Sequence, residues 1–124
     1  MKTLFKSTKI SQLEVSNRFF FPPIKTALGS PDGKITGAQL DFYRDIASDG
    51  PGVIILEPVA VTRDGREHPK QLAVDLADSQ EQLKKIVAVI HEEKRLACLH
   101  LNHAGASANP KASGLPTKAP SPVT

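Results

Sequence analysis

Two imidazoles and one amide occur within four residues near the carboxyl end of the chain: His100, Asn102 and His103. They follow the short aliphatic run Leu96–Leu99, which is bounded by a glycine-containing loop and is typical of a buried strand. Strands buried on both faces belong to parallel sheets, whose functional groups gather at the carboxyl ends of the strands. The cluster therefore indicates a binding or catalytic site, although either histidine alone would more often be structural.

A metal site is one alternative for this cluster. On a helix the spacing of His100 and His103 would suit a metal ion, but in an extended strand it directs the two imidazoles to opposite sides. Cys98 is the single cysteine, so zinc-type cysteine pairs and internal disulfides are excluded. We expect its thiol to be inert and buried in mid-strand. The sequence therefore disfavours a metal site.

Alternating strands and helices must position these residues. The sequence predicts strands near Phe19–Pro22, Val53–Glu57 and Leu96–Leu101, and helices near Gly37–Ser48 and Ser79–Lys94. Apolar side chains recur at helical spacing in both helices, and glycine, proline or polar loops separate the elements. Crossovers of this length predict that the three strands are parallel, in sequential order, with right-handed connections.

Local signals mark where the two helices begin and end. Thr36 is a candidate N-cap of the first helix, and Gly50 ends that helix. Gln39 falls on the helical wheel away from the apolar stripe. In the second helix Ser79–Gln82 fits a capping box, with Asp78 as an alternative cap.

The remaining segments are predicted to be irregular. Asp64–Gly65 predicts a tight surface turn. Residues 107–124 predict a loop-like tail, because Pro110–Thr124 carries four of the ten prolines and shows no periodicity. The chain has 124 residues, whereas a closed (β/α)8 barrel needs roughly 200 or more. We therefore expect residues 1–124 to be an α/β unit of about three βα repeats, the truncated N-terminal portion of a TIM (β/α)8 barrel.

Composition excludes several classes of protein. Hydrophobic residues make up 40% and charged residues 23%, which is ordinary for a globular chain. The net charge of +3 is spread along the chain without a basic run interleaved with aromatics, which argues against nucleic-acid binding. No apolar stretch approaches the roughly 20 residues of a membrane span, and neither G-x-G-x-x-G nor a P-loop is present. We expect a cytoplasmic protein.

A set of short segments extends along nearly the whole chain. They are Asn17–Pro23, Asp32–Gly33, Phe42–Arg44, Ile54–Glu57, Leu101–Gly105 and Ala119–Ser121. In order and spacing they resemble the N-terminal part of the Old Yellow Enzyme family of NADH:flavin oxidoreductases and alkene reductases. The resemblance implies an eight-stranded barrel that holds FMN over the carboxyl ends of its strands. It also implies hydride transfer from NADH or NADPH, through the flavin, to an activated alkene or related acceptor.

The resemblance further implies which residues contact the flavin. One strand end would place four residues along the isoalloxazine ring, and the next two strand ends one residue each: Pro22, Pro23, Ile24, Lys25, Pro58 and His100. Lys25 stands where relatives often carry Thr or Cys, and its ammonium would either stabilise the anionic reduced flavin or extend into solvent. His100 stands where many relatives have Gln, and Ala106 replaces a frequent Arg.

The family's catalytic acid machinery would lie outside this sequence. Its substrate-anchoring His/His or His/Asn pair, its catalytic tyrosine and its phosphate-binding loops would all follow Thr124. We therefore assign no catalytic residue to this chain. The expected partners are a small-molecule substrate and the remainder of the barrel, with a homo-oligomer as a further option.

Two other hypotheses remain open from the sequence. The first is a non-catalytic remnant or complementing half-barrel that associates with a partner chain through its open strand edges. The second is a different barrel enzyme, such as an aldolase-type lyase in which Lys25 forms a Schiff base. That chemistry requires a lysine desolvated enough to lose its proton, and nothing in the neighbouring sequence provides this.

Overall fold

The main sheet has three parallel strands in sequential order. The structure, a computed structural model, describes residues 2–122. Strands β3 (Phe20–Phe21), β4 (Val53–Ile55) and β6 (Leu96–Cys98) pair in the order β3-β4-β6. The predicted parallel, sequential arrangement is therefore confirmed, although each strand is shorter than expected.

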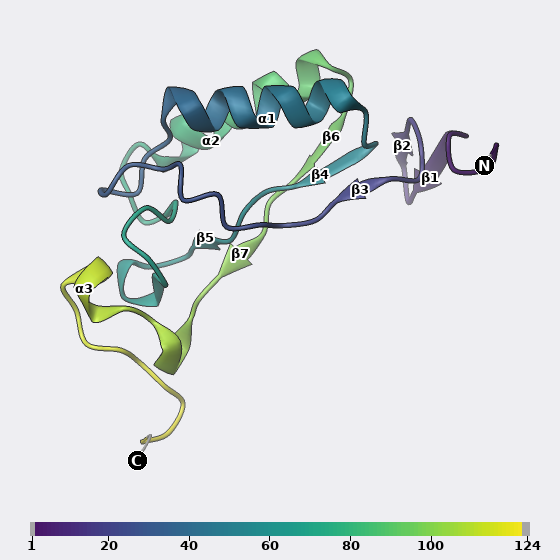
Figure 1. The fold of residues 1–124 in the computed structure, drawn as a ribbon. Coiled ribbons are helices and arrows are strands. Elements are labelled where there is room, and N and C mark those ends of the chain that lie inside the picture. Colours follow the sequence, from purple (N-terminus) through teal and green to yellow (C-terminus); the bar gives the residue numbers. More distant parts are fainter. Residues whose placement is uncertain (1, 123–124) are drawn as a thin grey trace.

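Two helices cover one face of this sheet (Figure 1). Helix α1 (Gly37–Asp49) connects β3 to β4, and α2 (Ser79–Glu92) connects β4 to β6. The α1 caps are as predicted: the Thr36 hydroxyl accepts from the backbone N–H of Gln39 at 3.3 Å, and Gly50 adopts the left-handed conformation with φ 106°. The predicted capping box of α2 is wrong.

Asp78 is the N-cap residue of α2, but its carboxylate makes no capping hydrogen bond. It instead accepts from the side-chain amide of Gln82 and pairs with Lys34 at 3.1 Å. The Ser79 hydroxyl donates to the carbonyl of Val74, so it too is engaged elsewhere. Contacts with Lys34, Gln82 and Val74 therefore take the place of the predicted capping bonds.

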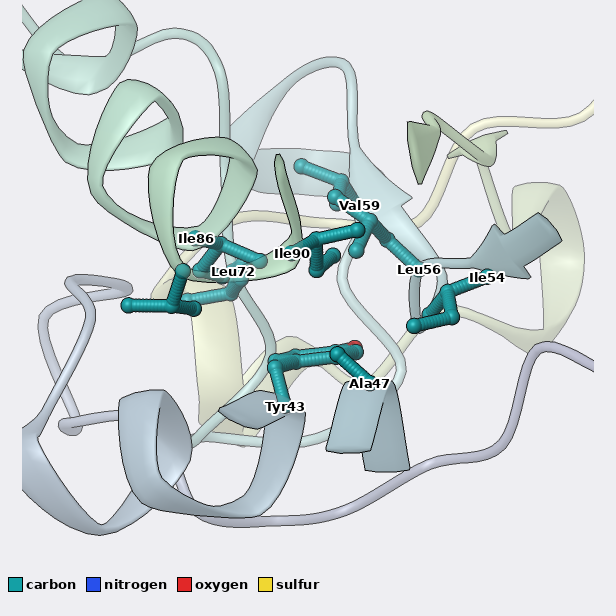
Figure 2. Close-up of a cluster of buried hydrophobic side chains, with 9 residues drawn as sticks. Tyr43, Ala47, Ile54, Leu56, Val59, Leu72, Ile86 and Ile90 are labelled. Carbon is teal, nitrogen blue, oxygen red and sulfur yellow. The ribbon is translucent and has the colours of Figure 1, made fainter. Parts of the chain in front are cut away.

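The core lies between the sheet and the two helices (Figure 2). It contains nine buried side chains, namely Tyr43, Ala47, Ile54, Leu56, Val59, Leu72, Ile86, Val89 and Ile90. The predicted burial of the second strand is confirmed, because Ile54 and Leu56 are 0% and 1% exposed. Apolar burial of this kind contributes ~25 cal/mol per Å² and holds the helices against the sheet.

Several short elements were not predicted from the sequence. An antiparallel hairpin, β1 (Thr8–Ile10) with β2 (Leu13–Val15), lies beyond the amino end of the sheet (Figure 1). At the carboxyl end, β5 (Val59–Ala60) and β7 (Leu101–Asn102) form a second parallel pair. The segment expected as a loop-like tail contains one helical turn, α3 (Pro110–Ser113), which Asn109 caps by accepting from the N–H of Lys111.

The third strand is not buried, contrary to the sequence prediction. Cys98 is exposed, and Leu99 and Leu101 are 44% and 55% exposed. Within residues 2–122, β6 is an edge strand of the sheet, and the helices cover only one face. The aliphatic run Leu96–Leu99 is therefore partly exposed to solvent, whereas the strands of a complete parallel barrel are covered on both faces.

Gly52 marks a close approach between the hairpin and the main sheet. A Cβ atom there would lie 2.6 Å from Val15 Cγ1 and 2.8 Å from the Asn17 carbonyl oxygen. Gly52→Ala is expected to destabilise the fold by ~1–3 kcal/mol, because backbone must move. Urea unfolding measures this. Gly37→Ala is the matched control, since a Cβ at Gly37 meets nothing within 4 Å; an equal loss in the control would contradict the prediction.

Candidate functional site

A β-bulge lies where the second and third strands reach their carboxyl ends. Ile55 pairs with Cys98 and Val59 pairs with Leu101, so three residues of one strand face two of the other. The ladder continues across the break, because Leu56 N–H donates to Cys98 and Val59 N–H donates to His100, both at 2.9 Å. The extra residue falls at Leu56–Pro58, where a proline without an N–H is tolerated.

The predicted site residues meet at this edge of the sheet. Pro22–Lys25 follows β3 directly, Pro58 lies in the bulge after β4, and His100 follows β6. The first two segments touch, because the Thr26 hydroxyl donates to the Glu57 carboxylate at 2.7 Å. The structure therefore brings the three strand ends together, while their role as flavin contacts stays a prediction.

Exposure differs among these residues. Pro22, Ile24 and Lys25 are exposed, Pro58 is buried, and His100 is half-buried. The Nδ1 atom of His100 is itself buried and has no hydrogen-bond partner among residues 2–122. A buried imidazole nitrogen without a partner is an unsatisfied donor or acceptor, and a ligand could satisfy it only if the ring turned towards the strand ends.

The Lys25 ammonium is paired with a carboxylate. Its Nζ contacts Glu67, which lies in the loop after β5. The side chains of Lys25 and Glu67 are 56% and 22% exposed. Next to this pair, burial lowers the pKa of His68, and the charges of Lys25 and Arg66 lower it further. Of the two alternatives from the sequence, stabilisation of the reduced flavin stays a prediction, and the exposed ammonium is held beside Glu67 and does not extend freely into solvent.

A buried polar cluster that sequence reasoning missed lies directly beneath this edge. Glu57 is 1% exposed, and its Oε1 accepts from Thr26 and from the side-chain amide of Gln39 at 2.6 Å. The Glu57 N–H donates to the Tyr43 hydroxyl at 2.8 Å. Burial raises the pKa of Glu57 and also that of Tyr43.

Gln39 corrects one expectation from the helical wheel. It is fully buried rather than solvated, because its amide bonds the Glu57 carboxylate. The available signal was the spacing of Gln39, Tyr43 and Ala47, which lie four residues apart and share one helix face. A charged residue directly after the most apolar strand was the second signal.

The turn at Asp64 is buried rather than a surface turn. Asp64 is 6% exposed and accepts from the Thr62 hydroxyl and the Lys118 ammonium, each at 2.5 Å. The Lys118 ammonium and the Thr62 hydroxyl lower the pKa of Asp64 to about 2, against the opposing effect of burial. His103 Nε2 lies 3.6 Å from the same carboxylate.

The polar residues that follow His100 have structural partners. Asn102 accepts from the side-chain amide of Gln71 at 3.3 Å. The His103 ring lies against Gly65, where a Cβ would be 2.6 Å from His103 Cδ2. Of the three polar residues that first indicated a site, His100 alone has an unpartnered buried atom.

Two features are absent from residues 2–122. No group of three or more metal-ligating side chains lies together in that range. None of the helices described there is long and apolar enough to cross a membrane.

Comparison with known proteins identifies the family. The family model described as NADH:flavin oxidoreductase / NADH oxidase matches residues 3–123. The chain therefore belongs to the NADH:flavin oxidoreductase / NADH oxidase family. The flavin of this family is FMN, and NADH or NADPH is the electron donor.

Curated relatives agree with this assignment. The chain is 32% identical over 122 residues to an NADH oxidase of Thermoanaerobacter brockii, covering 97% of this chain and 19% of that protein. It is also 32% identical over 106 residues to an NADPH dehydrogenase of Bacillus cytotoxicus, covering 85% of this chain and 31% of that protein. The chain thus spans between a fifth and a third of the length of these relatives.

Solved structures show the same fold. An Old Yellow Enzyme homologue from Zymomonas mobilis superposes with a TM-score of 0.88 at 22% identity, covering 96% of this chain and 33% of that chain. Old Yellow Enzyme from Pichia sp. AKU4542 gives 0.84 at 27% identity, covering 93% and 31%. The predicted fold is confirmed: the chain is an α/β unit that corresponds to about a third of an Old Yellow Enzyme barrel.

The Asp64–Lys118 contact yields a prediction about titration. Lys118→Met is expected to raise the pKa of Asp64 from about 2 towards the ordinary value of 3.8, because the mutation removes the main interaction that favours the charged form. NMR titration of carbon-labelled aspartate measures it. Lys111→Met is the control, since Lys111 makes no ion pair among residues 2–122. An Asp64 titration unchanged by Lys118→Met would show that this contact is not formed in solution.

Proposed function

We propose that this chain supplies one wall of the FMN site in an NAD(P)H-dependent oxidoreductase whose acceptor is an activated alkene or a related small molecule. One observation supports this most directly. Three parallel strand ends meet at one edge, where His100 Nδ1 is buried without a partner. Ligands of parallel β/α proteins bind at this edge.

The residues at the edge fit the chemistry of a flavin ring. Pro22, Pro23 and Ile24 would provide apolar contact to the isoalloxazine, and backbone groups of the same segments would bond its polar edge. Pro58 is buried at the neighbouring strand end, so it would contribute mainly by shaping the backbone there. His100 Nδ1 would add one hydrogen bond, as donor or acceptor according to the tautomer. FMN itself supplies the chemistry, since it accepts hydride from NAD(P)H and passes it on.

Lys25 and Glu67 would set the charge near the ring. An unpaired ammonium beside the flavin would favour its anionic reduced form. Because Glu67 is paired with Lys25, the two charges largely cancel, and this chain would present a nearly neutral group at that position. We propose that Lys25 therefore acts mainly by contact rather than by charge.

The phosphate of FMN would bind elsewhere. Barrel phosphate sites usually lie after strands seven and eight, whereas the main sheet described here has three strands. The substrate-anchoring and catalytic residues are likewise proposed to belong to the remainder of the barrel. A cytoplasmic location stays a prediction.

Flavin titration tests this proposal on the 124-residue chain. We expect the chain to quench the fluorescence of lumiflavin and of FMN. The two affinities should be equal and weaker than micromolar, because the chain contacts the ring and not the phosphate. His100→Ala is expected to weaken both by about tenfold, the effect of losing one buried hydrogen bond. His91→Ala is the control, since His91 is exposed at the end of α2. Unchanged affinity in His100→Ala, or much tighter binding of FMN than of lumiflavin, would contradict the assignment.

Association with a partner chain is the second candidate function. It is favoured by the outer edges of β3 and β6, which no strand within residues 2–122 pairs, and by large apolar side chains exposed near them, namely Phe19, Phe20, Ile24, Leu99 and Leu101. Open edges and apolar patches of this kind favour association. Whether the partner is the rest of a barrel or a second copy, the same surface is used.

Sedimentation measures whether the chain self-associates. The 124-residue chain is expected to self-associate with rising concentration, and Leu101→Lys is expected to reduce this by placing a charge on the exposed edge. Lys85→Glu on the exposed face of α2 is the control and should change nothing. A chain that stays monomeric at all concentrations would contradict the role of the open edges.

A further inference from the structure

Within residues 2–122, the carboxyl group of Glu57 is hydrogen-bonded through one of its two oxygens. Oε1 accepts from Thr26 Oγ1 at 2.7 Å and from Gln39 Nε2 at 2.6 Å, and the Tyr43 hydroxyl lies 3.5 Å away. Oε2 is equally buried and has no partner among residues 2–122. The Oε1 atom of Gln39 is also buried without a partner. Both unpartnered atoms thus belong to the same hydrogen-bonded pair.

An ionised Glu57 does not account for this arrangement. A carboxylate can only accept hydrogen bonds, so its bare oxygen would be a buried charge-bearing acceptor with no donor. The side-chain oxygen of Gln39 would be a second buried acceptor with no donor. Leaving such groups unpaired is costly, and no donor in the described part of the chain serves either of them.

One added proton resolves both deficits. A carboxylic acid offers one acceptor oxygen and one O–H donor, and a primary amide offers the complementary N–H donor and acceptor oxygen. The N–H of Gln39 already donates to Glu57 Oε1. A proton on Glu57 Oε2 would provide the missing donor. Gln39 Oε1, in the same hydrogen-bonded pair, is the acceptor that has no donor.

Among residues 2–122, no cation contributes to the shift in the pKa of Glu57. The side chains that hydrogen-bond the carboxyl come from two segments: Thr26 from the loop after β3, and Gln39 and Tyr43 from α1. Tyr43 is the one titratable group among them, and burial keeps it neutral by raising its pKa. Lys25, the neighbour of Thr26 in sequence, is paired with Glu67. Burial also raises the pKa of Glu57, which favours its neutral form.

We propose that Glu57 carries a proton on Oε2, and that the neutral Glu57–Gln39 pair is a positioning device that holds the segment Pro22–Lys25 through Thr26. The second half rests on the proposed flavin site. Thr26 connects the two, because its hydroxyl donates to Glu57 and accepts from the N–H of Leu28 at 3.2 Å. Glu57 is thus a positioning residue and not a catalytic one.

A proton on Glu57 makes the stability of the fold depend on pH. The folded chain holds the Glu57 proton more tightly than the unfolded chain, whose glutamate has its ordinary pKa of 4.5. The contribution of Glu57 to stability is therefore complete below pH 4.5 and is lost as pH rises through the higher pKa of the folded state. Ionisation would leave the Thr26 bond to Oε1 in place but would remove the Oε2–H donor to Gln39 that fixes the carboxyl, and so would loosen the segment after β3 that Thr26 anchors.

Infrared spectroscopy of the wild-type chain tests the proton directly and does not require a monomer. A carbonyl band of a protonated carboxyl is expected at neutral pH. The band should be absent in Glu57→Gln and present in Glu92→Gln, the control at an exposed position on α2. Absence of the band in the wild type, or its survival in Glu57→Gln, would overturn the proposal. The wild-type measurement decides even if a variant fails to fold.

Lumiflavin titration across pH tests the positioning role. Wild-type affinity is expected to fall by several-fold as Glu57 ionises, whereas Glu57→Gln, which mimics the neutral acid, should keep its affinity at all pH values. Thr26→Val should lose this pH dependence while the infrared band persists. Equal pH dependence in wild type and Glu57→Gln would overturn the positioning role. If no variant binds lumiflavin, the flavin site and the positioning role both fail, and the infrared result still decides the proton.

Discussion

The bulge at Leu56–Pro58 is the constraint on which the site depends. In a regular strand successive side chains point to opposite faces. Here Leu56 packs in the core (Figure 2), and the next residue, Glu57, also contacts α1 through Gln39 and Tyr43. The extra residue in the strand makes this possible and leaves Pro58 at the strand end. One local irregularity therefore places a buried polar cluster directly beneath the edge where three strands finish.

The regular part of the fold was predictable because its signals are local. The aliphatic run at Val53–Leu56, the cap at Thr36 and the stop at Gly50 all depend on neighbours in sequence, and the structure confirms each of them. The errors share the opposite property. Gln39 is buried by a carboxylate 18 residues away, and Asp64 is covered by Lys118 from the far end of the chain. No local pattern contains those partners.

The candidate site shows the same division. The meeting of the strand ends follows from parallel order, so Pro58 and His100 could be placed from the sequence. Burial of the third strand could not, because it depends on neighbours that residues 2–122 do not provide, and Cys98 is exposed as a result. The pairing of Lys25 with Glu67 also required the structure, since the loop that carries Glu67 has no periodicity.

The contact between Gly65 and His103 makes substitutions in two loops depend on each other. The loop after β5 and the loop after β7 touch where an aromatic ring occupies the space that a side chain at Gly65 would need. The Ala104 N–H donates to the Gly65 carbonyl at 3.0 Å, which keeps the two backbones at this separation. A larger residue at position 65 therefore fits this loop contact only if the residue at position 103 becomes smaller at the same time. Among relatives with the same loop lengths, these two positions should change together rather than singly.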